Sequence, residues 1–164
     1  MRRRTLAEWS TIADIAAAVA VVVSLLFVGL QVRDNTEALR SRNERALVDA
    51  LESLELSRVT DAGFAELMLR AETGGALSDV DRSRVQALAY LYLDNWEQAF
   101  HDRQKGLIDA DIWQALDDWL TARSRHAYFH AAVAEAATSG TYSQDFAAHL
   151  RDILTSTDSR AAER

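Results

Sequence analysis

Two pairs of ionisable side chains have the spacing of a helical metal site. Glu97 and His101 are four residues apart, and so are His126 and His130. Residues four apart lie on one helical face, so each pair could offer two ligands on one turn. Metal sites in helical bundles, however, use Glu-x-x-His pairs, which the sequence lacks. We therefore expect a solvated helix face for His101, with Asp94, and a partly buried, hydrogen-bonded role for one of His126 and His130. A metal-dependent helical-bundle enzyme that uses Glu97 and the three histidines is kept as the alternative hypothesis.

Other catalytic patterns are missing from the sequence. It contains no cysteine, which excludes disulfides, thiolate zinc sites and cysteine nucleophiles. It also contains no Gly-x-Ser-x-Gly elbow, glycine-rich phosphate loop or His-Glu-x-x-His run. Trp96, Trp113 and Trp119 suit the packing of a small core better than the lining of a ligand pocket. We assign no catalytic residue, cofactor or metal, and the sequence favours a protein that is not an enzyme.

Charge is distributed unevenly along the chain. The net charge is -7, but residues 1–45 hold seven arginines against five carboxylates. The remaining residues hold eleven basic side chains against twenty acidic ones, a balance of -9. An acidic domain repels phosphate backbones, so we expect no nucleic-acid partner.

The composition favours helices. The chain has no proline and only six glycines, so few residues interrupt a helical hydrogen-bond ladder. A chain of 164 residues has room for one domain plus an anchor. We predict an all-α protein.

One apolar stretch is long enough to cross a membrane. No formal charge occurs from Ile15 to Val32, and a helix of that length measures about 27 Å, close to the hydrocarbon thickness of a bilayer. Trp9 and Arg33 flank the stretch, as interfacial residues do. A buried core helix or a cleaved signal peptide is less favoured, because the domain is small and no small-x-small cleavage pattern follows. We predict a basic tail at 1–11 and a transmembrane helix at 12–32.

Residues in and after this helix are candidates for contact with lipid or with a second copy. Ala16, Ala20 and Ser24 recur every four residues and form a small-residue stripe on which another helix could approach closely. The other candidates are polar residues at the end of the span, namely Gln31, Arg33 and Asn35. They could bridge neighbouring copies, bind lipid headgroups or simply end the span. The predicted partners are the bilayer, a second copy of the chain in a homo-oligomer, and an unidentified protein. An oligomeric pore or signalling stalk is the second alternative function.

Beyond the anchor, the pattern predicts a polar stalk at 33–45, a helical bundle at 46–155 and a flexible tail at 156–164. Bundle helices are expected to begin at Asp61, at Ser78, at either Asp109 or Asp111, near Ala127, and at Ser143. Glycine pairs or single glycines are expected to end several of these helices. The longest of these helices follows Ser78 and ends at Gly106, with a broad apolar face.

Part of the chain resembles a known family. The run from Val22 to Arg40 contains Gln31-Val32-Arg33-Asp34-Asn35-Thr36, and later segments read Gly106-Leu107-Ile108-Asp109 and Tyr142-Ser143-Gln144-Asp145-Phe146. These resemble a family of uncharacterised bacterial single-pass membrane proteins in which a transmembrane helix precedes a Gln-x-Arg-x-Asn-Thr motif and an all-helical domain. The resemblance implies that architecture and supplies no catalytic residues.

The functional hypothesis is a membrane-anchored helical interaction or scaffold module that binds a protein partner or itself. The resemblance places it in a bacterial inner or cytoplasmic membrane. Basic residues on the two sides of the span nearly balance, with a slight preference for an extracytoplasmic domain.

Overall fold

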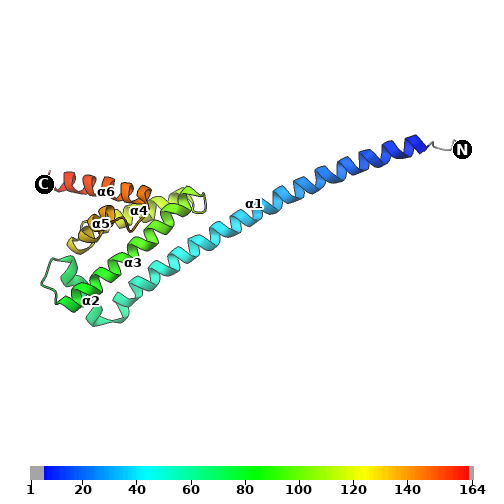
Figure 1. Cartoon of the computed structure of the whole chain (residues 1–164). Helices are drawn as coiled ribbons and strands as arrows, with labels where there is room; N and C mark the ends of the chain where they lie inside the picture. The colour runs from blue at the N-terminus through cyan, green and yellow to red at the C-terminus, as the bar shows by residue number, and fades with distance from the viewer. Residues whose placement is uncertain (1–5, 163–164) are drawn as a thin grey trace. The chain divides into compact units, whose positions relative to one another are not determined.

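The computed structural model describes residues 6–162, and these residues form six helices and no strand (Figure 1). The helices are α1 Leu6–Thr60, α2 Ala62–Glu72, α3 Asp79–Gln104, α4 Ala110–Arg123, α5 Ala127–Ser139 and α6 Gln144–Ala162. The predicted all-α class, with a long N-terminal helix followed by a smaller bundle, is confirmed.

The chain divides into two compact units, Met1–Leu39 and Arg40–Arg164. Helix α1 contributes residues to both, because the predicted stalk at 33–45 is helical throughout. Each unit is described here by itself.

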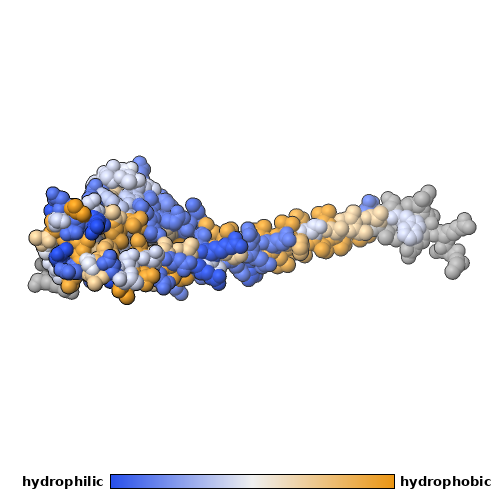
Figure 2. All heavy atoms as spheres, turned by 90° about the horizontal axis from the view of Figure 1, so that it is seen from below, coloured by the Kyte–Doolittle hydropathy of each residue, from blue (hydrophilic) through white to orange (hydrophobic). Residues whose placement is uncertain are grey.

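Within the first unit, residues 15–32 of α1 have an apolar surface on all sides. Leu25, Leu26 and Phe27 keep 60% or more of their surface exposed, and Val21 and Val22 more than half. Orange surface marks this stretch of α1 in Figure 2. A helix that is apolar all round is unstable in water unless protein or lipid covers it. By length and composition, α1 is able to span a membrane.

The ends of the bundle helices follow the predicted capping residues. Asp61 accepts a hydrogen bond from the N–H of Phe64 at 3.1 Å, and Ser78 accepts one from Asp81 at 3.2 Å. Gly106 and Gly140 follow α3 and α5 with φ of +69° and +73°. Glycine reaches this left-handed conformation without the steric penalty of a side chain, so both helices end there. Asp109, one of the two predicted caps, occupies the N-cap position of α4, but its side chain makes no capping hydrogen bond there.

Helix α3 supplies the centre of the second unit. Tyr92, Leu93 and Trp96 are completely buried on it, together with Phe129 of α5 and Phe146 of α6. Helix α3 packs against α2, α4 and α5, and α5 packs against α6. Aromatic rings interlock at this centre, for example Trp96 with Phe146 at 5.8 Å in an edge-to-face arrangement.

The last helix is longer than the predicted domain. Helix α6 runs on to Ala162, past residue 155 where the sequence predicts a flexible tail to begin. Residues 163–164 of that predicted tail, and residues 1–5 of the predicted basic tail, lie outside the described part of the chain.

Candidate functional site

The predicted metal candidates on α3 hold the start of α6. Glu97 Oε1 lies 3.7 Å from His101 Nε2, and the same carboxylate oxygen accepts a hydrogen bond from the backbone N–H of Ser143 at 2.7 Å. Ser143 Oγ lies 3.1 Å from His101 Nε2. A carboxylate near the first N–H groups of a helix satisfies donors that have no partner within the helix. This trio therefore anchors the N-terminus of α6 on α3.

The same trio lacks the geometry of a nucleophilic triad. In a triad the carboxylate binds one imidazole nitrogen and the hydroxyl binds the other, which fixes the tautomer and lets the ring accept the hydroxyl proton. Here Glu97 and Ser143 both approach Nε2 of His101. The arrangement therefore does not activate the Ser143 hydroxyl for attack.

The other two predicted metal candidates lie at the start of α5. His126 occupies the N-cap position of α5, and its ring stacks on Tyr128 with centroids 6.5 Å apart. His130 lies one turn later in the helix. Over residues 6–162, no group of three or more histidine, aspartate or glutamate side chains is placed to hold a metal ion. The structure therefore does not bring the four sequence candidates into one site.

A partly buried hydrogen-bonded pair on α4 and α6 was not evident in the sequence. Asp117 Oδ1 lies 2.7 Å from His149 Nε2 and accepts the indole N–H of Trp96 at 2.9 Å. The His149 ring also lies 5.8 Å from that of Trp113 and 5.4 Å from that of Phe100. Asp117 and His149 are 32 residues apart, so no helical spacing indicates their contact.

The candidate membrane and oligomer contacts all belong to the first unit and are all exposed. The exposed set comprises Ala16, Ala20, Ser24, Gln31, Arg33 and Asn35. Arg33 pairs with Glu37 one turn later, with 3.2 Å between Nε and Oε1. Thr36 donates a hydrogen bond to the carbonyl of Val32 at 2.9 Å. The set is thus available to lipid or to another helix.

A polar cluster ties the last turns of α1 to every neighbouring helix, and we call it the α1 clamp. Its members are Glu55 and Arg58 of α1, Glu72 of α2, Tyr92 of α3, Arg123 of α4 and Tyr128 of α5. The Tyr92 hydroxyl donates to Glu55 Oε1 at 2.5 Å, and Arg123 Nη1 lies 3.1 Å from the same oxygen. Arg123 also donates to the hydroxyls of Tyr128 and Tyr92 at 3.2 and 3.3 Å. Arg58 pairs with Glu72 at 2.9 Å.

Because Arg123 is buried in the α1 clamp, the stability of the clamp depends on the hydrogen bonds and ion pairs that this side chain makes. The Arg123 side chain is only 9% exposed. Burial, and then the hydrogen bond to Glu55, raise the pKa of the Tyr92 hydroxyl. Burial likewise raises the pKa of Tyr128, against the opposing effect of Arg123. A buried cation stripped of its partners would carry a large desolvation penalty, so the cluster fixes this end of α1.

A second set of contacts attaches the part of α1 where the second unit begins, near Arg40. Arg40 Nε donates to the carbonyl of Gly106 at 2.6 Å, and its Nη1 lies 3.5 Å from Asp109 Oδ1. Glu44 accepts the backbone N–H of Asp109 at 3.2 Å. Residues 40–58 of α1 are therefore held at both ends, by the α3–α4 turn and by the α1 clamp.

Between these attachments, α1 and α4 leave an open apolar groove, which we call the α1–α4 groove. It has a volume of about 600 Å³ and is lined by Leu47, Val48, Leu51, Glu52, Glu55, Ile112, Ala115, Leu116 and Trp119. Val48 is 55% exposed and Trp119 is 37% exposed. The groove is thus an apolar surface open to solvent on the second unit.

Comparisons with known proteins leave function to be argued from these features. No protein-family model matches the sequence, and searches of curated proteins and of solved structures find no significant match.

Proposed function

We propose that this chain is a membrane-anchored helical module that binds a protein partner or a second copy of itself through the α1–α4 groove. The observation that carries the proposal is that one helix, α1, contains an apolar exposed stretch able to span a bilayer and also forms one wall of the exposed groove. A membrane tether and an apolar contact surface are the two parts that such a module needs.

The composition of the groove supports a protein partner. Protein contact surfaces have an apolar, aromatic centre surrounded by polar residues, and tryptophan is enriched at their centres. The groove places Val48, Leu51 and Trp119 together, with Glu52 and Glu55 at its edge. Glu55 is already paired with Arg123, so the exposed Glu52 is the acidic residue that favours a partner segment with a basic residue beside its apolar face.

The family resemblance supports a bacterial membrane as the location of the protein. The distribution of arginines on the two sides of the span slightly favours an extracytoplasmic domain. We place the first unit in a bacterial inner or cytoplasmic membrane and the second unit on the extracytoplasmic side. A metal-dependent enzyme finds no support in the placement of Glu97, His101, His126 and His130.

Photocrosslinking of the full-length protein in its native membranes tests the proposal. A photoreactive amino acid replaces Val48 in the groove or, as the control, Val80, an equally apolar residue at the start of α3 that is 65% exposed. We expect light-dependent adducts from position 48 that are absent from position 80. An adduct of twice the 18.3 kDa chain identifies a second copy, and another mass identifies a different partner. Equal or absent labelling at the two positions would refute the groove as the contact surface.

A further inference from the structure

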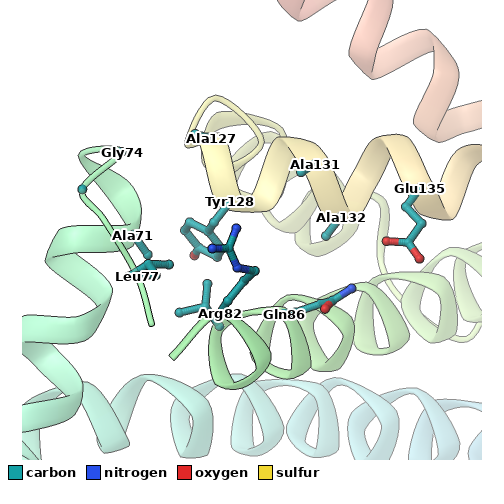
Figure 3. Close-up of a pocket in the computed structure, with 12 residues that line it drawn as sticks. Ala71, Gly74, Leu77, Arg82, Gln86, Ala127, Tyr128, Ala131, Ala132 and Glu135 are labelled. Atoms are coloured by element: carbon teal, nitrogen blue, oxygen red, sulfur yellow. The ribbon is translucent and has the colours of Figure 1, made fainter. Parts of the chain in front are cut away.

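A second cavity lies between α2, α3 and α5, away from α1. Its volume is about 380 Å³, and it is lined by Ala71, Gly74, Gly75, Leu77, Arg82, Val85, Gln86, Ala127, Tyr128, Ala131, Ala132 and Glu135 (Figure 3). We call it the α2–α3–α5 cavity. Cavities that bind small molecules start at about 300 Å³, so this one suits a small ligand and excludes a large one.

The floor of the cavity is apolar and well packed. Ala71, Val85 and Ala132 are each 5% exposed or less, and Leu77 packs against the same core. The small alanine side chains leave the space that a larger residue would fill. An apolar ligand body of a few carbon atoms would gain favourable free energy by covering this floor.

Opposite charges flank that floor. Arg82 comes from the first turns of α3 and Glu135 from the later turns of α5. In Figure 3 Arg82 lies beside Tyr128 in the middle of the cavity, Glu135 lies at one end, and Gln86 lies between them. Arg82 and Glu135 both line one small cavity, and Glu135 also interacts with the Tyr90 hydroxyl, whose pKa is raised by burial and by this carboxylate. Gln86 donates a hydrogen bond to the Tyr90 hydroxyl at 3.3 Å, which leaves its carbonyl oxygen as a further acceptor.

We infer that the α2–α3–α5 cavity binds a small aliphatic amino-carboxylate, of the size and charge of a free amino acid. The Arg82 guanidinium receives the carboxylate, for which its planar donors are suited. Glu135 and the Gln86 carbonyl receive the ammonium group. The alanine floor receives the aliphatic side chain.

The charge pattern separates this ligand class from others. A polyanion such as a phosphorylated metabolite would gain from Arg82 and be repelled by Glu135. A hydrocarbon would cover the floor and make no contact with either charged group, both of which are exposed to solvent. A zwitterion with a short apolar side chain meets all three features.

This inference goes beyond the proposed function and does not depend on it. The α1–α4 groove and the α2–α3–α5 cavity share no lining residue. Ligand binding is therefore measurable whether or not a protein occupies the groove.

Calorimetry and ligand-observed NMR on the full-length protein in detergent test the inference, with L-leucine and L-valine as probes. The comparison compounds are 4-methylpentanoate, which lacks the amine, and 3-methylbutylamine, which lacks the carboxylate. We expect at least one amino acid to bind with a Kd below about 1 mM, and each comparison compound to bind at least tenfold more weakly.

Variants assign that binding to the cavity. Arg82→Gln and Glu135→Gln should each weaken the amino acid at least tenfold, and Ala131→Leu should block it by filling the space. Arg84→Gln removes an exposed arginine of the same helix that does not line the cavity and should leave the Kd unchanged. All of these positions are exposed, so the variants are expected to fold. Absence of binding by both amino acids, or binding that Arg82→Gln leaves intact, would overturn the inference.

Discussion

The guanidinium carbon of Arg123 lies 4.5 Å from the centre of the Tyr92 ring. The contact is a cation–π interaction in a buried setting, and the same arginine also pairs with Glu55 of α1. One cation of α4 thereby joins the end of α1 to the central residue of α3. Arg123 therefore reinforces the attachment of α1 that Tyr92–Glu55 and Arg58–Glu72 also make at this end.

Replacing Arg123 with methionine should therefore destabilise the domain by about 2 kcal/mol. The value is below the usual cost of breaking a fully buried pair, because Glu55 is 38% exposed and partly solvated. Urea unfolding of the full-length protein measures the change. Arg125→Met, an exposed position in the following turn, is the control and should stay within about 0.5 kcal/mol of the original. Equal effects of the two changes would show that the clamp does not stabilise α1.

Alkaline pH should destabilise the domain through its buried tyrosines. Burial raises the pKa of Tyr142 above its usual value of 10.0, as does its hydrogen bond to Asp94, and burial raises that of Tyr92 similarly. The unfolded chain releases these protons near pH 10, whereas the folded chain keeps them. Stability is therefore full below about pH 10 and falls as the pH rises further.

Tyr142→Phe isolates one of these two groups. It should reduce the fall in stability above pH 10 by up to about 1.4 kcal/mol for each pH unit, while a constant difference separates the two proteins between pH 7 and 9. Urea unfolding at a series of pH values gives both slopes. Identical slopes above pH 10 would mean that Tyr142 does not hold its proton in the folded state.

The sequence predicted the elements of this fold well because their signals are local. Asp61 and Ser78 cap helices through hydrogen bonds to residues three positions ahead, and Gly106 ends a helix through its own backbone conformation. Such contacts depend on neighbours in the sequence, so a single chain reveals them. The apolar stretch from Ile15 to Val32 is equally local.

The candidate sites were less predictable because their contacts are distant in sequence. Arg123 meets Tyr92 across 31 residues, and Arg40 meets Gly106 across 66. The spacing of His126 and His130 suggested shared chemistry, but spacing within one helix does not say what the next helix supplies. Which side chains oppose each other depends on how the helices pack.

The turn at Gly106 should favour glycine over alanine. Gly106 has φ of +69°, which a side chain disfavours, and its carbonyl accepts the hydrogen bond from Arg40. Gly106→Ala should cost about 1 kcal/mol, seen as a lower urea midpoint. Gly29→Ala lies in a helix with open space around the new methyl group and should be neutral or mildly stabilising in the same detergent. A neutral Gly106→Ala would contradict the strained turn.

Membrane orientation can be measured cleanly because the chain contains no cysteine. Thr5→Cys and Ser83→Cys each introduce one thiol, on either side of the proposed span. We expect a membrane-impermeant maleimide to label position 83 in intact cells, and position 5 only after lysis. The reversed pattern would place the domain in the cytoplasm, and recovery of the protein in the soluble fraction without detergent would remove the span itself.

The junction of α3, α4 and α6 should depend on Asp117 as an acceptor more than on its charge. Asp117 accepts the indole N–H of the fully buried Trp96 and also contacts His149, and its side chain is 16% exposed. Asp117→Ala leaves the indole N–H without a partner in the core, which should cost about 2 kcal/mol. Asp117→Asn keeps one carbonyl oxygen for that donor and should cost less than half as much.

The neighbouring Asp118→Ala is the control. It removes an exposed carboxylate that accepts a hydrogen bond from Gln114 on the surface, and its stability should fall within about 0.5 kcal/mol of the original. Tryptophan fluorescence during urea unfolding reports all three variants, and equal losses from Asn and Ala would show that the pairing with His149, through its charge, dominates over the hydrogen bond to Trp96.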